Sequence, residues 1–162
     1  MAIITLTTDF GEKDPFAGAV KGAIYNEMPD MRIVDITHSI SPFHIPEAAY
    51  IIKNAYKSFP EGTIHIIGVD AELTPENKHL ALKLDGHFFI CADNGIMSLL
   101  TSEINPEKIV EINIHDAIKT NFPVLDVFVS VACHIARGGT LEVVGKISET
   151  IKELHYLKAQ AN

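Results

Sequence analysis

The first sixteen residues constrain the fold most, because they read as a strand, an acidic turn and a helix start. The segment opens with an uninterrupted run of isoleucine, leucine and threonine, which is typical of a buried strand. The run stops at Asp9, and Gly11 then permits backbone angles that other residues avoid. Asp14 and Pro15 supply an N-cap and a first helical residue. Asp9 and Asp14 thus follow the carboxyl end of a strand, where open α/β sheets bind ligands.

Strand and helix patterns alternate along the rest of the chain. We expect a first helix over 15–26, strands over 32–36, 63–69, 80–84, 87–91 and 108–114, and helices over 46–58, 96–104 and 126–137, the last capped by Asp126. This alternation predicts an α/β fold with a mostly parallel central sheet flanked by helices. A length of 162 residues suits one domain. We place it in residues 1–146, with 147–162 as a terminal helix or linker.

The composition limits the kinds of partner that the chain can bind and indicates the cell compartment in which it works. The net charge of −8 disfavours nucleic acid and anionic membranes as partners. No apolar run approaches the roughly 20 residues of a membrane span, and no basic region precedes the first strand, so we expect neither a membrane helix nor a signal peptide. Cys91 and Cys133 are far apart in the sequence, which indicates two buried, reduced thiols in a cytoplasmic protein.

Three predicted strands end in turns that contain aspartate, namely Asp9, Asp70 and Asp93. In a parallel sheet these ends share one edge, and an acidic crevice there suits either a ribose diol or Mg²⁺. The alternative is that the aspartates cap turns and helices. The histidine spacings predict no zinc site. Phe43 and Phe122 lie in predicted loops, where they either stack on a flat ring or plug the edge of the core.

Five sequence blocks together resemble the S-adenosylmethionine (SAM) hydroxide adenosyltransferases, which are adenosine-forming SAM hydrolases, and the related fluorinases and chlorinases. The match extends over essentially the whole chain and corresponds to the N-terminal domain of that family, so the family's C-terminal β-barrel is expected to be absent. The blocks are Ile4-Thr5-Leu6-Thr7-Thr8-Asp9-Phe10-Gly11 with Asp14, Asp35-Ile36-Thr37-His38 running to Ser41-Pro42-Phe43, Phe59-Pro60-Glu61-Gly62-Thr63-Ile64-His65, Asp93-Asn94-Gly95, and Asp126 with Gly138.

The resemblance implies a role for each candidate site residue. Asp9 matches the carboxylate that holds the ribose hydroxyls, and Phe43 an aromatic ring beside the sugar. Asp70 matches the aspartate of a water-activating Asp-Arg-His set, and is our catalytic candidate. Asp93 and Asn94 match a turn that shapes the pocket, and we add Asp14 and Phe122 as substrate-binding candidates. The resemblance also implies a homotrimer, SAM as substrate, and no cofactor or metal.

Two positions depart from the family pattern. Asn77 stands where the hydrolases usually have arginine, and Pro123 where they have histidine. Three hypotheses therefore stay open: a SAM hydrolase that retains Asp70, a non-catalytic SAM or adenosine binder, and, on the aspartates alone, a Mg²⁺-dependent phosphohydrolase. The sequence leaves the choice between water and halide as nucleophile open.

Overall fold

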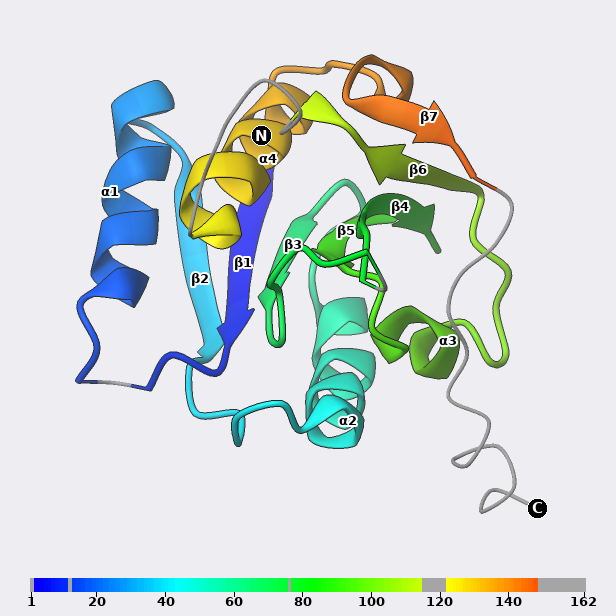
Figure 1. Ribbon diagram of the computed structural model, residues 1–162. Helices are drawn as coiled ribbons and strands as arrows, with labels where there is room; N and C mark the ends of the chain where they lie inside the picture. The colour runs from blue at the N-terminus through cyan, green and yellow to red at the C-terminus, as the bar shows by residue number, and fades with distance from the viewer. Residues whose placement is uncertain (1, 12, 76, 115–121, 149–162) are drawn as a thin grey trace.

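The computed structural model describes residues 2–11, 13–75, 77–114 and 122–148, and shows a seven-stranded sheet with the order β2-β1-β3-β5-β4-β6-β7 (Figure 1). The strands are β1 Ile3–Thr8, β2 Arg32–Thr37, β3 Ile64–Gly68, β4 His79–Leu84, β5 His87–Ala92, β6 Lys108–Ile112 and β7 Gly145–Ile147. Strands β2, β1, β3 and β5 pair in parallel, and β4 pairs antiparallel to both β5 and β6. The predicted α/β class with a mostly parallel centre is confirmed. The carboxyl ends of β1, β3 and β5 consequently lie at one edge of the sheet.

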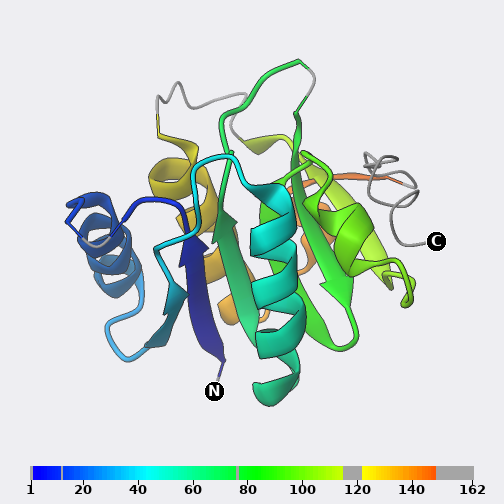
Figure 2. The same ribbon diagram turned by 90° about the horizontal axis from the view of Figure 1, so that it is seen from below.

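Helices cover both faces of the sheet (Figures 1 and 2). They are α1 Phe16–Glu27, α2 Ile45–Ala55, α3 Ile96–Leu100 and α4 Val129–Ala136, with 3-10 turns η1 Tyr56–Ser58 and η4 Leu141–Val143 and a π-helical turn η3 Val124–Phe128. One face carries α1, η3 and α4, and the other carries α2 and α3. The two apolar faces of the central strands account for this three-layer arrangement, because each must be buried.

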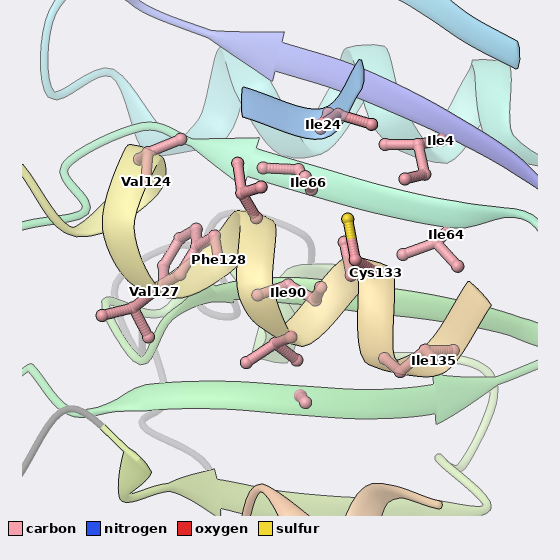
Figure 3. Close-up of a cluster of buried hydrophobic side chains, with 14 of the residues drawn as sticks. Ile4, Ile24, Ile64, Ile66, Ile90, Val124, Val127, Phe128, Cys133 and Ile135 are labelled. Carbon is pink, nitrogen blue, oxygen red and sulfur yellow. The ribbon is translucent and has the colours of Figure 1, made fainter. Parts of the chain in front are cut away.

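The larger core lies between α1, α4 and the sheet. Alternate residues of the central strands, such as Ile4, Ile66 and Ile90, point to this side and pack against Phe128 and Cys133 (Figure 3). A second core beneath α2 and α3 contains Phe89, Leu82 and Ile52 among its fully buried residues. The two cores follow from the period of two along each strand.

The helix ends differ from the sequence-based expectations. The helix at 46–58 is α2 followed by η1, and the helix at 96–104 ends at Leu100. The helical segment expected from Asp126 begins earlier, at Val124, so Asp126 lies in the first turn of η3 rather than at a cap. Helix α2 begins at Ile45 because the His44 side chain accepts a hydrogen bond from the Glu47 N–H at 3.1 Å.

Strand β7 was not predicted. Ile147, which we expected to begin a terminal helix or linker, is the last residue of β7 and pairs with Val110 of β6. Three residues are too few for the alternation of apolar and polar side chains to stand out. The remainder of that segment, from residue 149, lies outside the described residues.

Buried polar side chains gather at the amino-terminal ends of β3 and β5. The Oγ1 atom of Thr5 lies 2.7 Å from Nδ1 of His65, and Nε2 of His65 lies 3.2 Å from Nδ1 of His87. Burial lowers the pKa of His65 to about 3, and the charge of His87 adds to the shift. His65 is therefore a neutral residue of the core, at the opposite edge from the aspartates.

The two cysteines are buried and form no disulfide, as predicted. Burial raises the pKa of both thiols, to about 12 for Cys133, so neither is poised as a nucleophile. Among the residues that the structure describes, no helix is long and apolar enough to cross a membrane.

Candidate active site

A cavity of about 350 Å³ opens at the carboxyl ends of β1 and β3. Asp9 and Asp70 both line it, and the Asp9 N–H donates to the Gly68 carbonyl at 3.4 Å, which ties the two strand ends together. The two aspartates thus meet at one edge of the sheet, as the parallel topology predicts. The complete lining is Asp9, Phe10, Phe43, Gly68, Asp70, Ala71, Glu72, Phe122, Pro123 and Val124.

The Asp9 carboxyl group occupies a mixed electrostatic environment. Burial raises its pKa, and the neighbouring Asp70 charge acts in the same direction. Hydrogen bonds from the backbone N–H groups of Asp70 and Phe43 stabilise the anion and oppose that rise, but the net shift is upward. A half-buried carboxylate with spare acceptor positions is suited to a ligand that brings hydroxyl donors or a positive charge.

Of the three residues whose backbone hydrogen bonds lower the pKa of Asp9, two, Phe43 and Asp70, are held in the left-handed backbone region. Phe43 has φ 60° and Asp70 has φ 45°, and neither is a glycine. Non-glycine residues in this region cost on the order of 1–3 kcal/mol and gather at functional sites. In each case the unusual backbone angle accompanies an N–H group directed at the same carboxylate.

Aromatic rings form one wall of the cavity. The Phe122 ring lies 5.4 Å from that of Phe10 and 4.3 Å from that of Phe16, measured between centroids. Phe43 lines the cavity from the loop between β2 and α2, and 71% of its surface is exposed. The rings of Phe43 and Phe122 are thus both at the cavity, where a flat ligand can contact them.

The remaining sequence-based candidates, Asp14, Asp93 and Asn94, are not among the residues that line the cavity. Asn94 donates from Nδ2 to the carbonyls of Val69 and Asp70, at 3.0 and 3.1 Å, and so supports the turn that carries Asp70. The N–H of Asp93 donates to the Lys78 carbonyl at 2.6 Å. The Asp14 carboxylate accepts from the Phe16 N–H at 2.7 Å, but α1 begins at Phe16 with Pro15 at the N-cap position, one residue later than the sequence predicted.

The two departures from the family pattern occupy different places. Pro123 lines the cavity and precedes η3. Asn77 closes the turn with Thr74 through paired backbone hydrogen bonds of 3.2 Å and is absent from the cavity lining. The loop between β3 and β4 also lines a larger cavity of about 430 Å³ toward β6, but that cavity contains neither Asp9 nor Asp70. We therefore assign the site to the smaller cavity, which holds both carboxylates.

Sequence reasoning missed several lining residues. Glu72, Phe10 and Gly68 belong to the cavity, and a Cβ atom at Gly68 would lie 3.2 Å from side-chain atoms of Thr8 and Val124. The position of Phe10 directly after Asp9 was the available sequence signal for Phe10. Within the described part of the chain, no group of three or more histidine, cysteine, aspartate or glutamate side chains is arranged to hold a metal ion.

Comparison with known proteins agrees with the family resemblance found in the sequence. The family model of the SAM hydroxide adenosyltransferase N-terminal domain matches residues 4–145. The (R)-S-adenosyl-L-methionine hydrolase of Methanocaldococcus jannaschii is 31% identical over 99% of this chain and 65% of its own length, and the fluorinase of Actinopolyspora mzabensis is 20% identical over 98% and 62%. The crystal structure of an uncharacterized conserved protein from Thermotoga maritima superimposes with a TM-score of 0.86 at 28% identity, covering 94% of this chain and 60% of that one.

The chain is shorter than these relatives, spanning 65% of the M. jannaschii protein and 58% of the (R)-S-adenosyl-L-methionine hydrolase from Salinispora tropica. The family model nevertheless extends from the start of β1 to the start of β7, and therefore includes every residue of the cavity lining. On this match, the chain belongs to the SAM hydroxide adenosyltransferase N-terminal domain family.

Proposed function

We propose that this chain binds SAM or adenosine in the cavity at the carboxyl ends of β1 and β3, and that it is a hydrolase-type domain acting on SAM. The observation that carries the proposal is the Asp9 carboxylate, which lines the cavity together with Asp70 and is partly buried there, so that burial and the Asp70 charge raise its pKa. Asp9 accepts from the two ribose hydroxyls, and Phe43 and Phe122 contact the flat or apolar parts of the ligand. The positive sulfonium of SAM is matched to the acidic lining.

The reaction requires little from the protein beyond positioning. Water attacks the 5′ carbon of the ribose, the carbon–sulfur bond breaks, and methionine leaves as a neutral thioether, so no general acid is needed. Asp70 orients the water and accepts its proton. The products are adenosine and methionine. Neither a cofactor nor a metal takes part in this scheme.

A second candidate function is a binder of SAM or adenosine without turnover. It is favoured by Pro123, which lines the cavity where the family resemblance expects histidine and has neither a proton-handling side chain nor a backbone N–H. Binding depends on Asp9 and the aromatic residues, and turnover depends on Asp70 and its neighbours. The two functions are therefore separable by experiment.

For the surrounding molecule, we propose that the binding domain, predicted as residues 1–146, also includes Ile147 of β7, and that the protein works in the cytoplasm as a homotrimer. Family likeness supports the trimer, and exposed apolar residues such as Tyr50 and Val143 support self-association. Asp14 contributes indirectly through the start of α1, Asn94 through the Asp70 turn, and Asp93 as the residue next to Asn94 in the turn that the family resemblance assigns to the pocket.

The test is a binding titration followed by a turnover assay on the same protein. Calorimetry with adenosine and with SAM should show saturable binding to wild-type protein. Chromatography of a SAM incubation then measures adenosine, and also any 5′-halogenated adenosine formed when halide replaces water. Failure to bind either ligand would refute the proposal, while magnesium-dependent phosphate release from a phosphate ester would favour a phosphohydrolase.

A further inference from the structure

A line of side-chain contacts runs from α1 to the turn that carries Asp9. Lys21 of α1 forms an ion pair with Asp35 on β2, whose other carboxylate oxygen lies 2.7 Å from Nε2 of His38. Nδ1 of His38 lies 2.6 Å from Oγ1 of Thr8, the residue immediately before Asp9. Only 10% of the His38 side chain is exposed, so the ring is fixed between its two partners.

The chemistry of these partners assigns a direction to each hydrogen bond. A carboxylate only accepts hydrogen bonds, so the Nε2 atom of His38 is protonated and donates a hydrogen bond to Asp35. In the neutral ring Nδ1 is then an acceptor, and the Thr8 hydroxyl donates a hydrogen bond to it. The Thr8 oxygen in turn accepts from the Phe10 N–H at 3.3 Å. Although partial burial raises the pKa of Asp35, the hydrogen bonds from Lys21 and His38 lower it overall, which keeps the anion that orients the ring.

His38 contacts the Asp9 turn on both sides. Its ring holds Thr8 before Asp9, and its backbone carbonyl accepts from the Gly11 N–H after Asp9, at 2.7 Å. The loop that follows His38 leads directly to Phe43, whose N–H stabilises the Asp9 carboxylate. The orientation of Asp9 and the approach of Phe43 therefore both depend on how His38 is seated.

We propose that His38 is a positioning residue for the ligand, acting through Thr8 to fix the Asp9 turn, with Asp35 and Lys21 fixing the ring. This inference rests on the proposed function only where it invokes ribose binding by Asp9. The contact with Gly11 is made by backbone and persists in any substitution of His38. The effect of removing the ring must consequently pass through one of its two side-chain partners, Thr8 or Asp35.

The test compares the two ends of the ring. His38→Asn places an amide oxygen near the Nδ1 position and can still accept from Thr8, whereas His38→Gln reaches toward Asp35 and leaves Thr8 without its acceptor. By calorimetry with adenosine, we expect about tenfold weaker binding for His38→Ala and His38→Gln, and binding within about twofold of wild type for His38→Asn. Thr8→Val should match His38→Ala, and the double variant should be no weaker than either.

The matched control is His134→Ala, which removes another histidine with one contact to a loop carbonyl, that of Thr140 at 2.8 Å, away from the cavity. Its affinity should equal that of the wild type. Equal affinity of His38→Ala and wild type, or rescue by His38→Gln but not by His38→Asn, would overturn the proposal. Thermal unfolding of each variant confirms that the compared proteins are folded.

A measurement without ligand separates this inference from the proposed function. Nitrogen-15 NMR of the imidazole at pH 8 should show the tautomer with the proton on Nε2 for His38, and the Phe10 amide should exchange faster in His38→Gln than in His38→Asn. A proton on Nδ1, or equal exchange in the two variants, would refute the positioning role even if adenosine binds. If wild type binds neither ligand while these signatures hold, only the proposed function fails.

Discussion

At the scale of single residues, Asp9 and Asp14 are two aspartates of one turn with different contacts. Asp9 lines the cavity, and the Asp14 carboxylate accepts a hydrogen bond from the N–H of Phe16, the first residue of α1. We expect Asp9→Asn to weaken binding of adenosine or SAM by about 1.5–3 kcal/mol, because charge-assisted hydrogen bonds to the ribose are lost. Asp14→Ala should instead lower the free energy of unfolding by about 1 kcal/mol and leave affinity unchanged.

Calorimetry and urea unfolding on both variants decide between these roles. Unchanged affinity of Asp9→Asn would remove Asp9 from the site. A loss of affinity in Asp14→Ala at unchanged stability would instead support Asp14 as a direct contact of the substrate, the role predicted for it from the sequence.

The strained backbone at Phe43 permits a prediction that separates stability from binding. Phe43 is largely exposed, so replacing its ring removes little buried apolar surface. Its φ of 60° strains any residue that has a Cβ atom, so alanine keeps this strain and glycine relieves it. Phe43→Gly should therefore be more stable than Phe43→Ala by about 1 kcal/mol. Both variants should bind adenosine equally weakly if the ring contacts the ligand. Wild-type affinity in both would instead identify the ring as a cover for the edge of the core.

At the scale of elements, the paired His65 and His87 make the sheet sensitive to acid. The unfolded chain protonates His65 near pH 6.5, but the folded protein does so only near pH 3. Between these values the unfolded state binds more protons, so the free energy of unfolding falls as the pH falls, by up to about 1.4 kcal/mol per pH unit from this group.

Urea unfolding at pH 7.5, 6.5, 5.8 and 5.2 measures this slope before most carboxylates titrate. His65→Asn retains a partner for Thr5 but has no group that titrates, so its stability should depend less on pH than that of wild type over the lower part of this range. Parallel curves for the two proteins would show that His65 does not carry the acid sensitivity.

Most elements were predictable from the sequence because each had a local signal. The apolar run before Asp9 indicated β1, and the strand patterns over 80–84 and 87–91 indicated β4 and β5; the structure contains all three. Strand β7 and the π-helical turn before α4 depend on tertiary pairing and packing, for which a single sequence carries no periodic signal. The left-handed angles of Phe43 and Asp70 were equally hidden, since neither is a glycine.

The site residues that lie closest to a strand end were the most predictable from the sequence. Parallel topology is sufficient to bring Asp9 and Asp70 together, and the structure does so. It is insufficient to separate residues that line a cavity from those that support its walls. Asn94 is an example of a supporting residue, because its Nδ2 atom donates hydrogen bonds to the carbonyls of Val69 and Asp70. The contribution of His38 required the distances around its ring.

At the scale of the whole molecule, several large apolar side chains are exposed. Tyr50 on α2 is 70% exposed and forms, with Pro46 and Leu99, the rim of a small apolar depression between α2 and α3. We expect the purified chain to self-associate, with a trimer as the proposed state. Light scattering should give three times the mass of one chain. A monomer at all concentrations would contradict the proposal, and a Tyr50→Lys variant tests whether this surface takes part.

The rate of SAM hydrolysis by this chain depends on which polar side chains remain in the cavity. We expect slow hydrolysis of SAM or none, because Pro123 lines the cavity where a proton-handling histidine is expected, and loss of such a group costs about 10²–10⁴-fold. Asp70→Ala should abolish any remaining release of adenosine, and Pro123→His should raise the rate of release, both measured by chromatography. Unchanged binding of adenosine to Pro123→His is the control, because that residue is not required for the Asp9 contacts. Rapid release that survives Asp70→Ala would assign the chemistry to another group, and Glu72, the other carboxylate of the lining, would be the first to replace.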